Sequence, residues 1–214
     1  MITVPRNVGV DLYWLPLGAG GHFVRFNGRV YERILAHREH RQCCDLYHTA
    51  LVVTVSEGRF VIENAWPIPD GHPETRGVTI QGPVWSPALG RLRVFRYEVR
   101  RWLNGTIADL EYAVASPQAV SDDEEQARLV LELTERVPVH VWGRVASHAG
   151  EMWNSNSVIS WLLTMTGIPL ETVQPPPGGR APGWVTGVAL AQRDIATERS
   201  SHEFAWSRSS SIAL

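Results

Sequence analysis

The chain has 214 residues, of which 44% are hydrophobic, and it carries a formal net charge of -2. This length and composition are sufficient for one domain with a single core, and the near-neutral charge gives no overall attraction to nucleic acid. All 20 basic residues are arginine, which excludes every mechanism that needs a lysine nucleophile or a Schiff base.

The sequence shows none of the signals that direct a protein into or across a membrane. No run of apolar residues approaches the ~20 that span a bilayer, and the first residues lack the basic and apolar regions of a secretory signal. The two cysteines, Cys43 and Cys44, are adjacent and indicate no oxidising compartment. We therefore expect a cytoplasmic protein without a transmembrane segment. The arginine-only basic set, with much Ala, Gly and Pro, suggests a bacterial source.

The first half of the chain reads as strands. Residues 8–15 (VGVDLYWL) predict a first strand, and 47–55 and 59–65 predict a β-hairpin with its turn at Ser56-Glu57-Gly58. Residues 66–90 hold many of the prolines and glycines and predict an irregular insertion. Residues 91–99 (RLRVFRYEV) mix apolar residues with arginines, which is typical of a half-exposed strand.

Two helices are predicted in the second half. Ser121 followed by Glu124 predicts a capping box that starts a helix running to Pro138. A second helix is expected to begin near Asn154 or Ser155 and to stop at Gly167-Ile168-Pro169. The Ser-rich end, about 198–214, predicts a flexible tail. Because strands and helices are segregated, we expect one α+β domain over residues 1–214.

Two segments that lie far apart in the chain carry candidate functional residues. His48 stands at the start of the hydrophobic strand LYHTALVV, where it would be held rigidly. Ser155 stands in the small polar cluster that opens the second helix, where free backbone N–H groups and the helix dipole stabilise an oxyanion. The ordinary alternative is that Ser and Asn simply cap this helix.

The segment LYHTALVV resembles the histidine strand of the PPPDE family of permuted papain-like peptidases, whose pattern is close to WHTSIVV. Asn154-Ser155-Asn156-Ser157 resembles the NCNSF helix start of that family. The order of histidine before nucleophile is shared with the lecithin:retinol acyltransferase-like enzymes. The resemblance covers about 8–65 and 151–167. It implies a circularly permuted papain-like (NlpC-like) fold, in which an antiparallel sheet packs against the nucleophile-bearing helix.

The resemblance also implies an activity, with one departure from the family pattern. It implies a hydrolase or acyltransferase that acts on an amide, thioester or ester bond through an acyl-enzyme, with His48 as general base. The family cysteine, however, is Ser155 here. Three explanations are open: a native serine nucleophile, an inactive binding module, or a cysteine replaced to trap a complex. A serine hydroxyl needs a well-oriented base to react.

The third member of a triad is expected on the strand after the histidine strand. Similarity to the acyltransferase-like enzymes places Glu63 there, and a register shift by one residue would put Asn64 in its place. The ordinary alternative for Glu63 is a solvated or structural carboxylate. Residues that could support Ser155, His48 and Glu63 are Asn64, Asn154, Asn156, Ser157 and Trp153.

Two further patterns have less weight. One run of potential ligands could be interpreted as a metal site; it comprises His37, His40, Cys43, Cys44 and His48. Arg38 and Arg41 lie within this run and would repel a cation. We therefore expect no metal, and we expect no cofactor. Several of the nine tryptophans lie near the proposed site, as core residues or as a wall for a bound chain: Trp66, Trp142, Trp153 and Trp161. The expected partner is a peptide, protein or acyl-chain substrate, and not nucleic acid.

Overall fold

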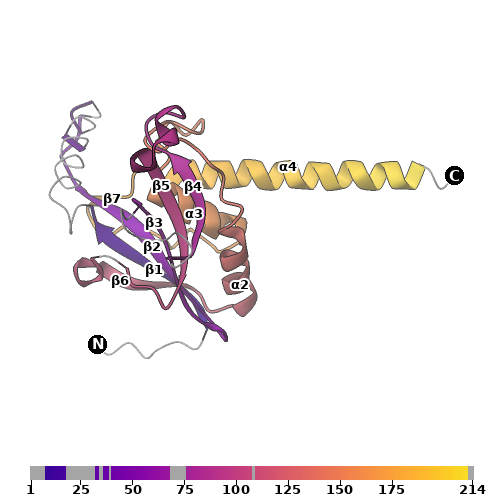
Figure 1. Ribbon diagram of the computed structural model, residues 1–214, viewed down its shortest axis with the longest axis horizontal. Coiled ribbons are helices and arrows are strands. Elements are labelled where there is room, and N and C mark those ends of the chain that lie inside the picture. Colours follow the sequence, from indigo (N-terminus) through magenta and orange to yellow (C-terminus); the bar gives the residue numbers. More distant parts are fainter. Residues whose placement is uncertain are drawn as a thin grey trace.

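The fold is an antiparallel β-sheet with helices on one face (Figure 1). The computed structural model describes residues 8–17, 32–33, 36–38, 40–67, 76–107 and 109–211, with side chains up to Ser201. The strand order is β4-β5-β3-β2-β1-β6, and the short β7 (Gly179–Arg180) pairs in parallel with the start of β2. An α+β fold was expected and is confirmed.

The central strands form where the hydrophobic pattern predicted them. β1 (Gly9–Pro16), β2 (Asp45–Val55) and β3 (Gly58–Ala65) lie side by side, with Leu12 opposite Leu51 and Leu51 opposite Ile62. The turn between β2 and β3 is tight, because Val55 pairs directly with Gly58. Gly58 has a φ of 140°, which side chains rarely allow. The predicted first strand and hairpin are confirmed.

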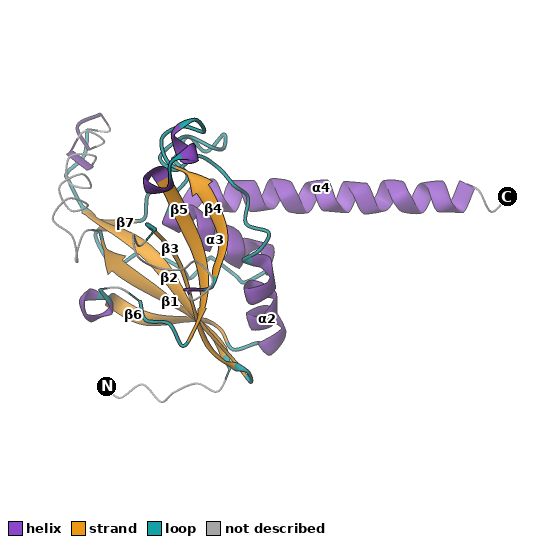
Figure 2. Ribbon diagram, viewed as in Figure 1, coloured by secondary structure: helices purple, strands orange, loops and turns teal. Residues whose placement is uncertain are grey.

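Alternation along the strands gives the sheet two different faces. One face carries Leu12, Leu51 and Ile62, which belong to the main core together with residues of the helices. The opposite face carries a second, smaller cluster of buried residues, comprising Leu15, Ala50, Val52, Val61 and Ile107. Figure 2 shows the three longest helices, α2 (Glu124–Leu133), α3 (Ser155–Met165) and α4 (Trp184–Ser211), on one side of the strands. Each residue of a strand is therefore assigned to the helix-covered face or to the opposite face.

The first predicted helix forms, but with a different cap. α2 (Glu124–Leu133) begins after Asp123, whose side chain accepts a hydrogen bond from Gln126 N at 2.9 Å. The capping box expected from Ser121 and Glu124 is wrong, because Ser121 Oγ accepts instead from Asp123 N at 3.1 Å. The helix ends at Leu133, before the expected Pro138.

The second predicted helix is confirmed as α3 (Ser155–Met165). Gly167 follows it with a φ of 70°, the left-handed conformation that commonly ends a helix. α3 packs closely on α4 (Trp184–Ser211), since a Cβ on Gly187 would lie 2.1 Å from both Ser157 O and Ser160 Oγ. α3 is thereby held between the sheet and α4.

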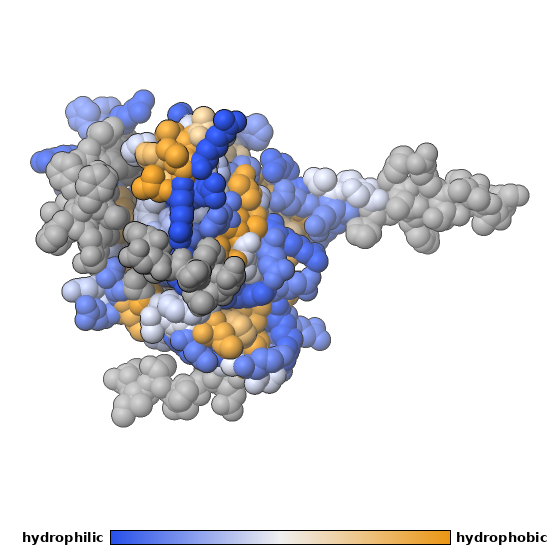
Figure 3. Space-filling model, viewed as in Figure 1, coloured by the Kyte–Doolittle hydropathy of each residue, from blue (hydrophilic) through white to orange (hydrophobic). Residues whose placement is uncertain are grey.

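The sequence missed several elements. β4 (Val78–Pro83) lies within the expected irregular stretch 66–90, of which residues 68–75 are outside the described part. The strand expected at 91–99 begins only at β5 (Arg96–Leu103), after two short 3-10 turns, Leu89–Arg91 and Arg93–Phe95. Apolar and hydrophilic side chains lie side by side over these turns (Figure 3).

Two further differences concern the edges of the fold. β6 (Val114–Ser121) was not predicted, because its side chains are mostly half-exposed and it gains its hydrogen bonds from β1. α4 projects beyond the sheet (Figure 1) and continues to Ser211, through most of the stretch for which we expected a flexible tail. Among the described helices, none combines the length and the hydrophobicity that a membrane crossing needs.

Candidate functional site

The polar cluster Asn154-Ser155-Asn156-Ser157 forms the N-terminus of α3. Asn154 Oδ1 accepts hydrogen bonds from Asn156 N at 2.9 Å and from Ser157 N at 3.3 Å. Ser157 Oγ in turn accepts from Asn154 N at 3.2 Å. This reciprocal pair is a capping box, which satisfies backbone donors that a helix start would otherwise leave unpaired.

Asn156 ties the helix to the histidine strand. Its Nδ2 donates to Tyr47 O and to Pro182 O, both at 2.9 Å, and Thr49 Oγ1 donates to its Oδ1 at 3.0 Å. Asn156 is 2% exposed, so these bonds are formed in the interior. Asn156 therefore holds together β2, α3 and the segment before α4.

Asn154 and Ser157 fix the same segment from the other side. Asn154 Nδ2 donates to Pro182 O at 2.8 Å, and Ser157 Oγ donates to Gly183 O at 2.8 Å. Gly183 has a φ of 88°, and a Cβ there would lie 2.4 Å from Asn154 Oδ1. Asn154, Asn156 and Ser157 therefore all stabilise the start of α3 or its contacts, and these hydrogen bonds explain why the residues are polar.

Ser155 is the exception in this cluster. It is the first residue of α3 and is 6% exposed, and its hydroxyl makes no hydrogen bond to any residue that the structure describes. A hydroxyl at this place lies near the positive end of the helix dipole. Ser155 is therefore positioned as the sequence predicted, and its chemistry depends on which groups surround it.

His48 lies on the face of the sheet opposite α3. It pairs across β1–β2 with Leu15, and residues directly across a pair share a face. Leu15 and the next-but-one residue Ala50 both belong to the cluster on the face without helices. Thr49, the neighbour of His48, is the residue that contacts α3. The structure therefore does not bring His48 and Ser155 together.

The environment of His48 is apolar. Burial lowers the pKa of His48 to about 4, and the carboxylate of Asp109 opposes this shift only in part. A neutral imidazole is thus the stable form at neutral pH. The charged group that acts on it is Asp109, and His48 makes no hydrogen bond to Ser155 or to Glu63, all three of which the structure describes.

Glu63 is engaged in an ion pair of its own. It lies directly across β3–β5 from Arg100, and its Oε1 accepts from Arg100 Nη1 at 3.0 Å. Burial raises the pKa of Glu63, against the effect of the guanidinium. Glu63 lies on the same face of the sheet as His48, but its carboxylate is paired with Arg100. This is the structural role that was the predicted alternative to a catalytic one.

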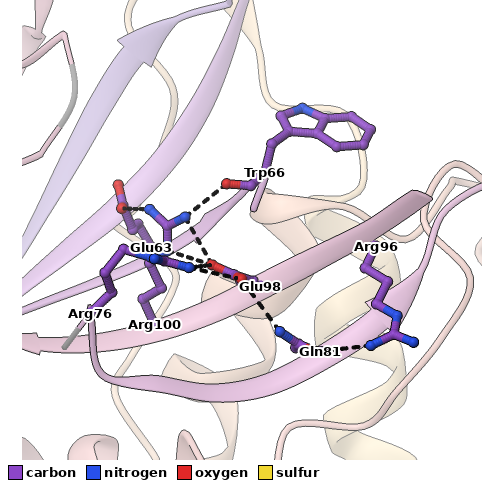
Figure 4. A network of polar contacts seen from close by, with 7 residues as sticks. All are labelled: Glu63, Trp66, Arg76, Gln81, Arg96, Glu98 and Arg100. Atoms are coloured by element: carbon purple, nitrogen blue, oxygen red, sulfur yellow. Dashed lines mark hydrogen bonds and ion pairs between the residues drawn. The ribbon is translucent and has the colours of Figure 1, made fainter. Parts of the chain in front are cut away.

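Glu63 belongs to a larger buried network on this face (Figure 4). At its centre Glu98, which is fully buried, accepts from Arg76 Nη2 at 3.2 Å and from Arg100 Nη2 at 2.9 Å. Arg100 Nη2 also donates to Trp66 O at 2.7 Å, and Gln81 Nε2 donates to Glu98 at 3.3 Å. Sequence reasoning missed this network, although the run RYEVRR on one strand places Glu98 and Arg100 on the same face.

Asn64, the alternative third residue, lies on the helix-covered face. It pairs with Val99 and follows Ile62 by two residues, and both belong to the main core. Its Oδ1 and Nδ2 are buried and have no hydrogen-bond partner among the residues that the structure describes. A buried polar atom without a partner costs free energy. Asn64 is therefore a polar group that the fold itself does not use.

Aromatic rings lie around the helix start. Trp153 is fully buried and its Nε1 donates to Tyr97 Oη at 3.2 Å. The ring of Trp142 lies 5.7 Å from Tyr97 and 6.2 Å from Trp66, which is 49% exposed. Trp66 is the first residue after β3 and lies two residues after Asn64 in the chain. Tyr97, Trp142 and Trp66 therefore form one aromatic cluster that extends from the interior to the surface.

Trp161, the fourth tryptophan singled out in the sequence, lies further along α3 and donates to Asp194 of α4 at 3.0 Å. It therefore serves the contact between these two helices.

The potential metal ligands near Cys43 do not converge. Within the described residues, no three His, Cys, Asp or Glu side chains lie close enough together to hold a metal ion. Cys44 Sγ instead donates to Glu32 Oε1 at 3.2 Å, and burial raises the pKa of this thiol. Cys43 is exposed, and both thiols are free.

Comparisons of the chain with protein-family models, with curated proteins and with solved structures found no match. The geometry of the residues themselves therefore has to carry any functional conclusion.

Proposed function

We propose that this chain is a non-catalytic binding module that retains the order of elements of a permuted papain-like domain. The observation that carries the proposal is the placement of His48 and Ser155 on opposite faces of the sheet. A serine hydroxyl is not ionised near neutral pH and reacts only when a base accepts its proton. Since His48 faces the other way and Glu63 is paired with Arg100, Ser155 lacks both partners of the expected triad.

The ligand of such a module is a peptide, a protein segment or an acyl chain with an amide group. The Asn64 amide carries two N–H donors and a carbonyl acceptor, none of them paired within the described residues, and an amide group of a ligand can satisfy both kinds. Trp66, two residues after Asn64 in the chain, has its ring 6.2 Å from that of Trp142, and the two rings supply an apolar surface. A binding site commonly combines apolar walls with a few well-placed polar groups, and this arrangement supports recognition of an amide at Asn64.

An active-site probe tests the non-catalytic part of the proposal. We expect a fluorophosphonate to leave Ser155 unlabelled in folded protein. In a Ser155→Cys variant of protein that also carries Cys43→Ser and Cys44→Ser, we expect the pH dependence of iodoacetamide reactivity to be unchanged by a further His48→Ala substitution, since His48 faces away from α3 and cannot stabilise the thiolate. Labelling of Ser155 that disappears in His48→Ala would overturn the proposal and favour the acyl-enzyme hydrolase that the sequence predicted.

Replacing Asn64 by leucine tests whether its amide is kept for a ligand. We expect Asn64→Leu to raise the free energy of unfolding by about 1–3 kcal/mol, because it removes two buried polar atoms without partners at nearly constant volume. Chemical denaturation measures the change. Asn154→Leu is the control of opposite sign, since losing the cap of α3 should destabilise by about 1 kcal/mol. A destabilised Asn64→Leu protein would show that the amide has a structural partner and would contradict the ligand role.

A further inference from the structure

One part of the surface is much more apolar than the rest. The four most exposed large hydrophobic side chains of the described residues are Val94 at 69%, Val145 at 64%, Trp85 at 62% and Leu92 at 57%. All four lie in two segments, residues 84–96 and 142–145, which we call the turn lobe. Single exposed apolar residues are ordinary on a protein surface, but a cluster of the most exposed ones marks an interaction site.

The turn lobe is a built structure and not a loose loop. Trp85 N donates to Trp142 O at 3.2 Å, and Arg144 Nε donates to Trp85 O at 3.0 Å, so the two segments are joined. Val84 N donates to Phe95 O at 2.8 Å, and the ring of Phe95 lies 6.3 Å from that of Trp85. These hydrogen bonds therefore fix the backbone that carries the exposed side chains.

The charge of the turn lobe is basic, in contrast to the chain as a whole. No Asp or Glu occurs between residues 75 and 97 or between residues 136 and 150, whereas both stretches contain arginines. Arg91 and Arg144 are exposed within the lobe, next to Leu92 and Val145. Figure 3 shows the same mixture of apolar and strongly hydrophilic side chains over the turns between β4 and β5. The net charge of -2 therefore hides a local basic and apolar surface.

The exposed side chains of the turn lobe favour a lipid surface over nucleic acid as the anionic partner. Three of the four exposed groups are aliphatic, and aliphatic side chains cannot stack on nucleobases as aromatic rings do. Leu92 lies between the two 3-10 turns and Val94 lies in the second, with Arg91 in the first. Apolar groups at such tips can enter the acyl boundary of a bilayer while guanidiniums contact lipid phosphates, and tryptophan is favoured at that level.

We propose that the turn lobe docks the protein on the surface of an anionic lipid bilayer, with Leu92, Val94, Trp85 and Val145 inserted and Arg91 and Arg144 at the headgroups. This contact is peripheral and involves no membrane-spanning segment. It is independent of the proposed binding of an amide at Asn64, because neither the four inserted side chains nor the two arginines belong to that site.

Sedimentation with lipid vesicles tests the proposal. We expect the full chain to co-sediment with phosphatidylcholine vesicles that contain phosphatidylserine and to stay in solution with pure phosphatidylcholine. The double variant Leu92→Ser/Val94→Ser should weaken binding at least about tenfold, since each side chain loses apolar burial. Arg91→Gln/Arg144→Gln should weaken it about tenfold or more at low salt.

Matched controls separate the lobe from general surface effects. Leu103→Ser removes an apolar residue that is 47% exposed at the other end of β5, and Arg193→Gln removes an exposed arginine of α4; both should bind as the unmodified protein does. All substituted positions are exposed, so far-ultraviolet circular dichroism should be unchanged. Failure of the unmodified protein to bind the anionic vesicles would overturn the proposal. So would binding to single-stranded DNA or polyglutamate that persists in Leu92→Ser/Val94→Ser, since that would indicate an electrostatic partner without insertion.

Discussion

Replacing Glu98 by glutamine is expected to lower the free energy of unfolding by about 3–5 kcal/mol. Glu98 is fully buried and is the common partner of two arginines that are each 4% exposed, Arg76 and Arg100. Glutamine keeps the shape but removes the negative charge, so Arg76 would lose its carboxylate partner and Arg100 would keep only Glu63. Leaving a buried charge uncompensated is among the most destabilising changes that one substitution can make.

Two comparisons show whether the charge is the cause. Glu132→Gln removes a carboxylate from an exposed pair with Arg136 on α2 and should cost under about 0.5 kcal/mol. Adding Arg76→Met to Glu98→Gln should recover part of the loss, because it removes the guanidinium that Glu98→Gln leaves without a carboxylate. Equilibrium urea unfolding measures all four proteins. Equal effects of Glu98→Gln and Glu132→Gln would contradict the assignment of a buried network.

The stability of the protein is expected to fall by about 2–3 kcal/mol through His48 as the pH drops from 6.5 to about 4. Burial lowers the pKa of His48 to about 4, so in this range the unfolded chain binds a proton that the folded chain does not. Protonation therefore favours unfolding, and this contribution is absent above pH 6.5, where both states are neutral. The figure allows for the partial exposure of the ring to solvent.

The variant His48→Gln isolates this effect from the titration of carboxylates. Denaturation at several pH values should give a flatter profile for the variant between pH 6.5 and 4, and the difference between the two curves belongs to His48. Titration of the imidazole by NMR should give a midpoint near 4. A midpoint close to 6.5 would mean that the ring faces water, and it would contradict the burial of His48 on the apolar face of the sheet.

The fold follows from the sequence wherever local pattern and packing agree. The hairpin of β2 and β3 was predictable because its hydrophobic run and its Ser56-Glu57-Gly58 turn point to the same structure. β4 and β6 were not, because edge strands lack the buried alternation that reveals a strand and take their hydrogen bonds from a neighbour. The start of β5 was placed too early, since arginines alternate with apolar residues both in the turns and in the strand.

The candidate site shows the same division. The capping role of Asn154 and Ser157 and the start of α3 at Ser155 were predictable, because a helix start needs side chains that accept from backbone N–H groups. The pairing of Glu63 with Arg100 was not, since it depends on the strand that lies beside β3. Asn64 was predicted as a substitute for Glu63 or as a supporting residue, whereas the burial of its amide without a partner among the described residues depends on the packing around β3.

By itself, the sequence determined that His48 and Thr49 point to opposite faces of one strand, because side chains alternate along any β-strand. It also determined that a helix begins at Ser155. Only the tertiary structure decided which face of the strand α3 covers, because that choice depends on packing between segments distant in the chain, and a shift of one residue exchanges the faces. α3 covers the face of Thr49, so the two segments that match a catalytic pair in the sequence are in contact, but His48 faces away from α3.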